Sequence, residues 1–363
     1  MSAPTPLPQH APPRADVVTL GEEHVGEIAS FVAAESGRVP EDVQSHLRWF
    51  LLENPARESQ APLGFGLRSA GQLVGCILCS PQYFRFEREK ILFVGSSSFY
   101  VDERYRGHGG RIFLQYSRLG RRQPLFGTSA NPVSAALWEA AGATSIPYSD
   151  VELFGVLRWS PVAEEFAHRS YSNRLLTRLS ASPISNLVAL ANPLKIDCST
   201  SGALHPLESA EQVNDLPLHH PSTKLTSLRE LPYIRWRYFS GRDSTVAAFA
   251  FRCRQPDSDI LVTVNQRIRG YRGQINTLNV LDVYPEVSFG EWLRIVGALI
   301  ARYRNSVDAI VLRDQSSEQQ KLFCAKGFRQ RRFEAPSGWF LDNARLLPKS
   351  EWYPVPADGD GLI

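Results

Sequence analysis

The run Ile91–Tyr116, ILFVGSSSFYVDERYRGHGGRIFLQY, decides the interpretation of this sequence. Its apolar first part predicts a strand that ends at Val101, and a charged turn and a glycine-rich loop then lead into a helix that begins near Arg111. Glycines let consecutive backbone N–H groups point into one concavity, and the helix adds the positive end of its dipole. The run therefore predicts a phosphate-binding loop built on Gly107, Gly109 and Gly110.

The composition is that of an ordinary globular protein. With 363 residues, of which 43% are hydrophobic and 21% charged, the chain is long enough for two domains. The net charge of +3 is too small to indicate a nucleic-acid partner. Of the five cysteines only Cys76 and Cys79 lie close together, and no second pair completes a zinc site. We therefore expect a reduced, cytoplasmic protein without a metal.

The two ends of the chain have a different composition from the rest. Residues 1–15 are rich in proline and are expected to form a disordered tail, with prolines where a signal peptide would have its apolar core. Residues 345–363 are expected to form a C-terminal tail. No apolar run is long enough for a transmembrane helix, so we expect no membrane span.

Between these tails, the first half alternates helices and strands. Apolar spacing and turn residues predict helices over residues 22–35, 46–53 (ended by Asn54 and Pro55) and 131–141, a hairpin over 63–79, and strands over 125–129 and 151–157. This order predicts a mixed α/β (α+β) fold, with a mostly antiparallel sheet flanked by helices.

The second half repeats the same order of elements. The segment Tyr233–Asp243 matches the segment that begins at His46, and both contain an Arg-Trp pair, Arg48-Trp49 and Arg235-Trp236. We expect each pair to pack its helix on its own sheet and to hold an acidic partner. The repeat predicts two tandem domains, at residues 16–160 and 201–344, joined by a linker at 161–200 that contains a helix.

The two copies differ at the loop. Where the first has YRGHGGR, the second has VYPEVSFG, with Glu286 and Phe289 in place of small residues. An acidic, crowded turn repels and blocks a phosphate group. Only the first copy is therefore expected to keep the site.

The run Val101–Gly110 resembles motif A of the GCN5-related N-acetyltransferase superfamily, whose Arg/Gln-x-x-Gly-x-Gly/Ala loop wraps the pyrophosphate of acetyl-CoA. Arg106 and Gly109 match the first two fixed positions, and Arg111 departs from the third. A register that starts at Arg104 fits the letters and covers the same loop. The double arrangement is similar to bacterial double-domain members of the superfamily and to Fem-type aminoacyl transferases.

A second segment, NPVSAALWEAAGA, resembles the later strand-helix motif of the superfamily, in which Asn131 would open the helix. Members of the superfamily often carry a tyrosine near the end of this helix, which protonates the leaving thiolate. Trp138 occupies the matching position, so that role must fall to another group or to solvent.

The resemblance implies that acetyl-CoA or another acyl-CoA binds to the first domain, with a backbone N–H near Ser98–Tyr100 polarising the thioester carbonyl. The implied cofactor-binding residues are Ser98, Phe99, Tyr100, Val101, Arg106, Gly107, His108, Gly109, Gly110, Arg111 and Asn131.

The resemblance further implies direct attack by a primary amine of a small molecule, for example an amino sugar. Candidates for the general base are Tyr148, Asp150 and Glu152, which precede the last strand of the first half and need no function if they are ordinary loop residues. Two alternatives stay open. One is an inert acyl-CoA-binding module, and the other is an aminoacyl transferase that uses charged tRNA, against which the small net charge counts.

The linker allows two interpretations. Arg169, Arg174 and Arg178 lie among leucines at near-helical spacing, as in a basic amphipathic helix that rests on an anionic membrane. A linker helix laid across both domains is the favoured interpretation. The sequence leaves open the acceptor, the length of the acyl chain and the oligomeric state.

Overall fold

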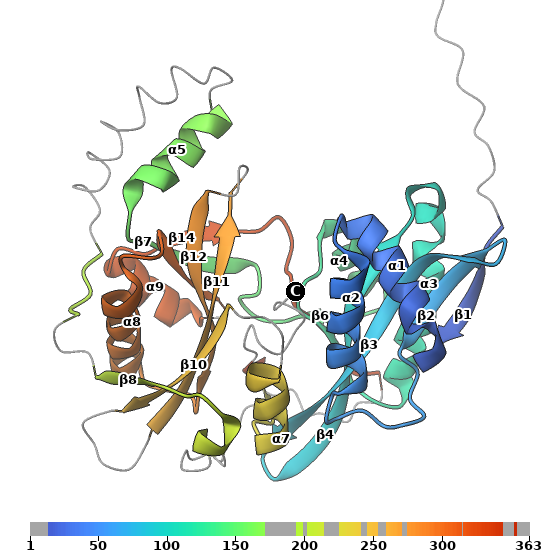
Figure 1. Ribbon diagram of the computed structural model, residues 1–363, viewed down its shortest axis with the longest axis horizontal. Helices are drawn as coiled ribbons and strands as arrows, with labels where there is room; N and C mark the ends of the chain where they lie inside the picture. Colours follow the sequence, from blue (N-terminus) through green and yellow to red (C-terminus); the bar gives the residue numbers. More distant parts are fainter. Residues whose placement is uncertain are drawn as a thin grey trace, which may run out of the picture.

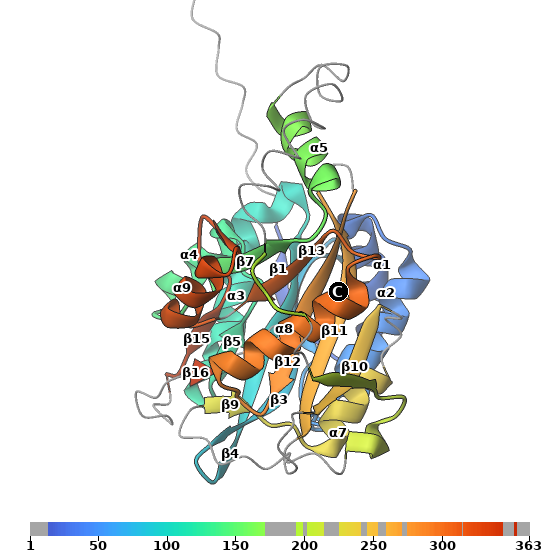
Figure 2. The ribbon, with the colours of Figure 1, turned by 90° about the vertical axis from the view of Figure 1, so that its left-hand side faces the viewer.

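The computed structural model describes residues 14–170, 194–198, 202–213, 225–240, 245–252, 259–270, 274–313, 315–343 and 352–353. These residues form two mixed sheets that lie side by side, each with flanking helices (Figures 1 and 2). The predicted α+β class, with two similar halves, is confirmed.

The first sheet has the strand order β1-β2-β3-β4-β5-β15-β6. Its strands are β1 (Asp16–Leu20), β2 (Gly64–Ser69), β3 (Gln72–Phe86), β4 (Glu89–Val101), β5 (Leu125–Gly127), β15 (Trp339–Leu341) and β6 (Thr144–Ser145). Two short strands, β9 (Leu225–Ser227) and β16 (Trp352–Tyr353), join it through β3. Its helical segments are η1 (Glu22–His24), α1 (Val25–Ser36), α2 (Pro40–Leu47), the π-helix η2 (Arg48–Leu52), η3 (Glu103–His108), α3 (Gly109–Ser117), η4 (Arg118–Arg121) and α4 (Pro132–Ala140).

The second sheet has the strand order β14-β7-β13-β12-β11-β10-β8. Its strands are β14 (Arg329–Arg332), β7 (Val151–Val156), β13 (Ala309–Arg313), β12 (Ile275–Tyr284), β11 (Asp259–Arg269), β10 (Val246–Arg252) and β8 (Ala203–Pro206). The accompanying helical segments are α5 (Trp159–Ser170), η5 (Ala210–Val213), α7 (Leu231–Ile234), the π-helix η6 (Arg235–Phe239), α8 (Phe289–Tyr303) and α9 (Ser317–Ala325). Buried side chains of α8 pack on one face of this sheet (Figure 2).

Each half contributes to the sheet of the other half, the first half through β7 and the second half through β15 and β9. Strand β7, the last strand of the first half, pairs with β13 and β14 in the second sheet. Strand β15, near the end of the second half, pairs with β5 and β6 in the first sheet. Neither 16–160 nor 201–344 therefore contains a complete sheet, and the domain boundaries stay a prediction. Periodicity identifies a strand, but the partner of a strand depends on the tertiary fold.

The Arg-Trp helices pack against each other as well as against strands of the two sheets. Trp49 in η2 and Trp236 in η6 lie against each other, with ring centroids 5.3 Å apart, inside one apolar cluster that draws residues from both halves. Of the two arginines, Arg235 has the expected acidic partner, since it forms an ion pair with Glu211. The repeated motif thus joins the two halves, because the ring of each tryptophan packs on the ring of the other copy.

Several predictions fall partly or wholly outside the described residues. These include the N-terminal tail up to residue 13, Arg174 and Arg178 of the linker, and most of the C-terminal tail. Helix α5 covers the beginning of the predicted linker helix. Within the described part of the chain, no helix has the length and apolarity needed to cross a membrane.

Candidate functional site

A gap opens in the first sheet beside β4. Strands β4 and β5 pair in parallel at Val94–Leu125 and Gly95–Phe126, and beyond Gly95 the two strands separate. On its other side β4 contains a bulge, because Tyr100 pairs with Cys76 while Ser97 pairs with Leu78. Ser98, inside the bulge, has a φ of 48°, a left-handed conformation that is uncommon for serine. The bulge re-aims the end of β4 into the gap.

The glycine-rich loop follows β4 as the turn η3 and the first residues of α3. Gly109 has ordinary helical angles, φ −55° and ψ −38°. The sequence suggested that glycine is needed here for an unusual backbone conformation, and the structure does not show one. A Cβ atom at Gly109 would come no nearer than 3.6 Å to a side chain of the protein, and one at Gly107 would meet nothing within 4 Å. The glycines instead keep the loop bare of side chains, which leaves room for a ligand.

The equivalent helices α3 and α8 differ at their N-termini. In α8, Ser288 and Glu291 form a capping box, in which Glu291 Oε2 accepts from Ser288 N at 2.8 Å. In α3, the N-cap residue His108 makes no side-chain cap, and the first turn contains no acidic residue. The positive end of α8 is therefore neutralised by its own carboxylate, whereas the first turn of α3 has no such carboxylate.

The gap and the loop border one cleft of about 860 Å³, which we call the loop cleft. Most of the predicted cofactor residues line it, namely Ser98, Phe99, Tyr100, Val101, Arg106, Gly109, Gly110 and Asn131. Gly107, His108 and Arg111 are not part of its lining. Arg111 Nη1 donates to the backbone carbonyl of Ala15 at 2.7 Å, so its side chain is held beside β1.

The floor of the loop cleft is apolar and includes Trp138, which is 2% exposed. The Trp138 ring packs edge-to-face on Phe113 and Tyr116, at centroid distances of 5.2 and 5.8 Å. Asn131 caps α4 as predicted, because its Oδ1 accepts from Ser134 N at 2.9 Å. The predicted strand-helix motif therefore has the expected shape and places a tryptophan where a tyrosine is frequent.

Four ionisable side chains that line the loop cleft were missed in the sequence, namely Glu35, Arg38, His46 and Arg267. Glu35 of α1 is exposed, and His46 of α2 is half-buried. The His46 ring stacks on Phe50 at 5.8 Å and meets the edge of Trp49 at 5.3 Å. The only signal available was the position of His46 just before the Arg-Trp pair, and nothing in the sequence links that helix to the loop.

A second cleft, of about 610 Å³, adjoins the first and is lined by residues of both halves. We call it the arginine cleft, because its lining includes Arg267, Arg269, Arg313, Arg331 and Arg332. Both clefts are lined by Ser129, Ala130, Asn131 and Arg267. The two clefts therefore meet at these residues.

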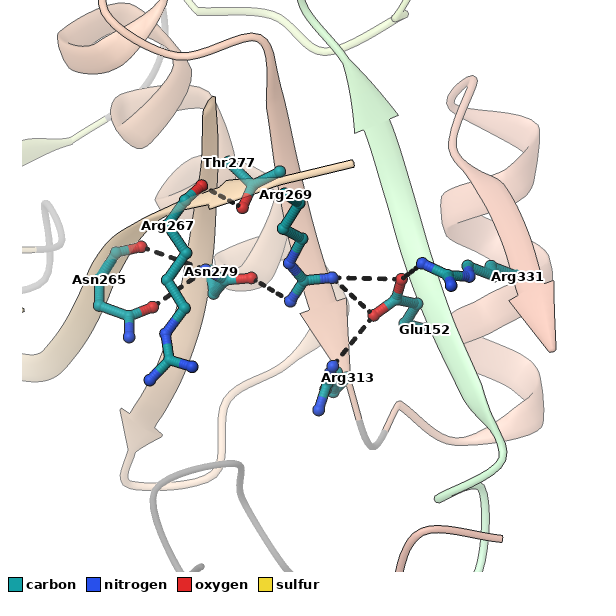
Figure 3. A network of polar contacts seen from close by, with 8 residues as sticks. All are labelled: Glu152, Asn265, Arg267, Arg269, Thr277, Asn279, Arg313 and Arg331. Atoms are coloured by element: carbon teal, nitrogen blue, oxygen red, sulfur yellow. Dashed lines mark hydrogen bonds and ion pairs between the residues drawn. The ribbon is translucent and has the colours of Figure 1, made fainter. Parts of the chain in front are cut away.

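The three predicted base candidates do not line either cleft. Tyr148 is 40% exposed, and the backbone carbonyl of Asp150 accepts from Phe333 N at 2.8 Å. Glu152 is buried under the arginine cleft, where its carboxylate accepts from Arg269, Arg313 and Arg331 at 3.1–3.3 Å (Figure 3).

The electrostatic surroundings of Glu152 oppose a role as a base. Burial would raise the pKa of its carboxyl, but the positive charges of Arg269 and Arg313 hold that pKa below its ordinary value. A carboxylate stabilised in this way is a weak proton acceptor. The arrangement suits a residue that positions arginines.

The fold is found in solved structures at low sequence identity. A probable N-acyltransferase from Enterococcus faecalis, described as a conserved protein of unknown function, aligns with a TM-score of 0.57 and 12% identity, over 91% of this chain and 73% of that one. A GCN5-related N-acetyltransferase from Anabaena variabilis aligns with a TM-score of 0.54 and 12% identity over the same shares. The N-myristoyltransferase of Saccharomyces cerevisiae, with bound myristoyl-CoA, aligns with a TM-score of 0.54 and 11% identity, over 94% of this chain and 85% of that one.

These likenesses establish the fold, which is that of the GCN5-related N-acetyltransferases and N-myristoyltransferases. The sequence matches no protein-family profile and no curated protein. The chemistry of this chain must therefore be argued from its own clefts.

Proposed function

We propose that this protein is an acyl-CoA-dependent N-acyltransferase with acetyl-CoA as its donor and a primary amine of a small molecule as its acceptor. The observation that carries the proposal is the difference between α3 and α8. Of these two equivalent helix N-termini, one lacks a side-chain cap and borders a cleft of about 860 Å³, and the other is closed by Glu291. An uncapped N-terminus with a bare glycine loop is suited to the pyrophosphate of CoA.

The separated strands β4 and β5 support a position for the rest of the donor. The pantetheine arm would lie along Ser96–Val101, where β4 has no pairing with β5. The bulge at Ser98 would direct a backbone N–H to the thioester oxygen, where negative charge develops during attack. The large buried side chains of Phe113 and Trp138 on the cleft floor favour a short acyl group.

Catalysis would depend mainly on positioning. The acceptor amine would enter from the arginine cleft and attack the thioester at the shared boundary near Asn131. We propose His46 as the group that takes the proton from the amine, directly or through water, because it lines the loop cleft and its ring is held by Phe50. The leaving thiolate would be protonated by solvent, since the Trp138 indole is not an acid.

The first test is the thermal stability of the protein with acetyl-CoA. A ligand that binds only the folded state raises the melting temperature. At a concentration one hundred times Kd it adds about 2.7 kcal/mol to the free energy of unfolding. Absence of a shift at saturating acetyl-CoA would refute the proposal.

The matched variants are Gly110→Glu and Gly290→Glu. Both glycines are exposed at the second position of their helices, and a Cβ atom at either would contact nothing nearer than 3.9 Å. We expect the Gly110 variant to lose the acetyl-CoA shift and the Gly290 variant to keep it. The opposite pattern would place the donor in the second half.

A second candidate, an acyl-CoA-binding module without catalysis, is favoured by one observation. None of Tyr148, Asp150 and Glu152 lines the loop cleft or the arginine cleft. Release of free CoA thiol in the presence of amines, followed with a thiol reagent, separates the two functions, because a binding module produces the thermal shift without thiol release.

A further inference from the structure

The arginine cleft contains more positive charge than its carboxylates balance. Among the described residues, five guanidinium groups line it, whereas the carboxylates are Glu334 on the lining and Glu152 beneath it. Arginine keeps its charge in proteins, so this imbalance persists at every physiological pH.

Strand register creates the imbalance. Arg313 of β13 and Arg331 of β14 are the direct neighbours of Glu152 on either side of β7. Arg269 of β11 reaches the same carboxylate with Nη1 and donates with Nη2 to Asn279 Oδ1 at 2.6 Å (Figure 3). Three guanidinium groups thus converge on one carboxylate.

One carboxylate cannot satisfy this set of donors. A guanidinium has five N–H donors, and Glu152 accepts from a single terminal nitrogen of each arginine. The arginines also repel one another. Burial lowers the pKa of Arg269, Glu152 opposes this, and the charges of Arg313 and Arg331 lower it further. Three guanidinium groups around one carboxylate therefore leave an excess of positive charge beside the cleft.

An independent sign of a ligand comes from Asn265. This residue is fully buried, lines the arginine cleft, and accepts from Asn279 Nδ2 at 3.0 Å through its Oδ1. Its Nδ2 has no hydrogen-bond partner among the described residues. A buried donor without a partner is costly, which indicates that a group outside the protein accepts from it. Asn265 and Arg267 are two positions apart on β11, so their side chains lie on the same face of the sheet. Both side chains extend to the same side in Figure 3.

We infer that the acceptor amine carries an anionic group, a carboxylate or a phosphate, that binds in the arginine cleft to Arg267, Arg269, Arg313 and Asn265 N–H groups. This inference rests on the proposed function for its use in catalysis. Guanidinium groups bind both oxyanions through paired N–H···O contacts, and the cleft volume of about 610 Å³ suits a small molecule. Anchoring the anion near the boundary of the two clefts would place the amine at the thioester.

The test is anion binding to the full chain with the loop cleft already filled. With saturating CoA present, the melting temperature is measured at increasing concentrations of inorganic phosphate and, in a separate series, of acetate. Chloride keeps the ionic strength constant in both series. We expect a saturable increase with at least one anion, and the stronger of the two identifies the anionic group. No increase beyond that of chloride would overturn the inference.

The decisive variant is Asn265→Asp, which keeps the shape of the side chain and its acceptor for Asn279 but replaces the donor with a negative oxygen. We expect it to weaken anion binding roughly tenfold to a hundredfold. The matched control is Arg252→Gln, since Arg252 is exposed on β10, pairs with Asp259 and is not part of the cleft. Unchanged anion binding in the Asn265 variant would refute the site.

The two proposals fail in different ways. If CoA shifts the melting temperature and the anions do not, the acyltransferase proposal stands and the anionic acceptor is wrong. If CoA produces no shift, the acyltransferase proposal fails, and the anion measurements without CoA still decide whether the arginine cleft binds an anion. Retention of the CoA shift by each variant shows that the variant is folded.

Discussion

Trp49 and Trp236 exchange hydrogen bonds across the two halves of the chain. Trp49 Nε1 donates to the backbone carbonyl of Trp236 at 2.9 Å, and Trp236 Nε1 donates to the backbone carbonyl of Trp49 at 2.9 Å. The rings are inclined by 26°, and each tryptophan lies in a π-helical turn. A reciprocal contact of this kind follows from two similar copies facing each other, and it places η2 and α2 where His46 borders the loop cleft.

This reciprocal pair should contribute strongly to stability. Each tryptophan is at least 93% buried, so Trp49→Ala is expected to cost about 3–5 kcal/mol. The milder variants Trp49→Phe and Trp236→Phe each remove one indole donor. Since the rings support each other, the double variant should lose about 0.5–1.5 kcal/mol less than the sum of the two singles. Denaturant unfolding measures the coupling, and strict additivity would contradict it.

A buried ion pair links the segment that follows β9 to the second sheet. Arg229, which follows β9 of the first sheet, pairs with Asp282 of the second sheet at 2.9 Å, and both side chains are 1% exposed or less. Tyr238 also donates to this carboxylate, at 2.7 Å. Asp282→Asn should cost about 3–5 kcal/mol, because it leaves a buried guanidinium without its counter-charge.

The control for this pair removes the stranded charge. In the double variant Arg229→Met with Asp282→Asn, the new amide still accepts from Tyr238, and no cation remains buried. We expect its free energy of unfolding to exceed that of Asp282→Asn alone. A double variant less stable than the single one would show that hydrogen bonds of Arg229, and not its charge, dominate.

The Glu152 cluster predicts a pH dependence with a definite sign. The pKa of Glu152 is lowered in the folded state, where burial is outweighed by Arg269 and Arg313. Its contribution to stability is therefore present above the unfolded pKa, about 4.3, and is lost as the pH falls through the folded pKa.

Glu152→Gln should thus be less stable than the wild type at pH 7, and the two should converge in acid. Unfolding in denaturant at pH 7, 5 and 3 measures the difference. Asp259→Asn is the matched control, since its exposed pair with Arg252 should change stability by less than about 1 kcal/mol. A difference between wild type and Glu152→Gln that is independent of pH would show that folding does not lower the pKa of Glu152.

The proposed base can be tested apart from donor binding. His46→Gln keeps a polar side chain of similar length but removes the proton acceptor, so it should lower kcat about a hundredfold or more and leave the acetyl-CoA thermal shift unchanged. Glu35→Gln, on the neighbouring helix, is expected to retain most of the rate because Glu35 is exposed. The reverse ranking of these two variants would assign the base to Glu35.

Local features of the fold were predictable because they depend on neighbours in sequence. The apolar strand up to Val101, the glycine loop, the cap at Asn131 and the duplicated order of elements are all set by residues a few positions apart. The conformation of Gly109 was not predictable, because glycine can adopt helical or left-handed backbone angles and the residue type alone does not distinguish them. Likewise, nothing local shows that β7 and β15 join the opposite sheets.

The sequence by itself determined the α+β class, the duplication and which of the two equivalent loops lacks bulky side chains, since periodicity and glycine spacing express these directly. Only the tertiary structure decided which side chains share a cleft. It places His46 on the lining of the loop cleft. It pairs Glu152, a predicted base, with three arginines, and it places five arginines on the lining of one cleft. The physical reason is that strand register and the packing of the two halves set distances between residues more than one hundred positions apart, and these distances leave no trace in local pattern.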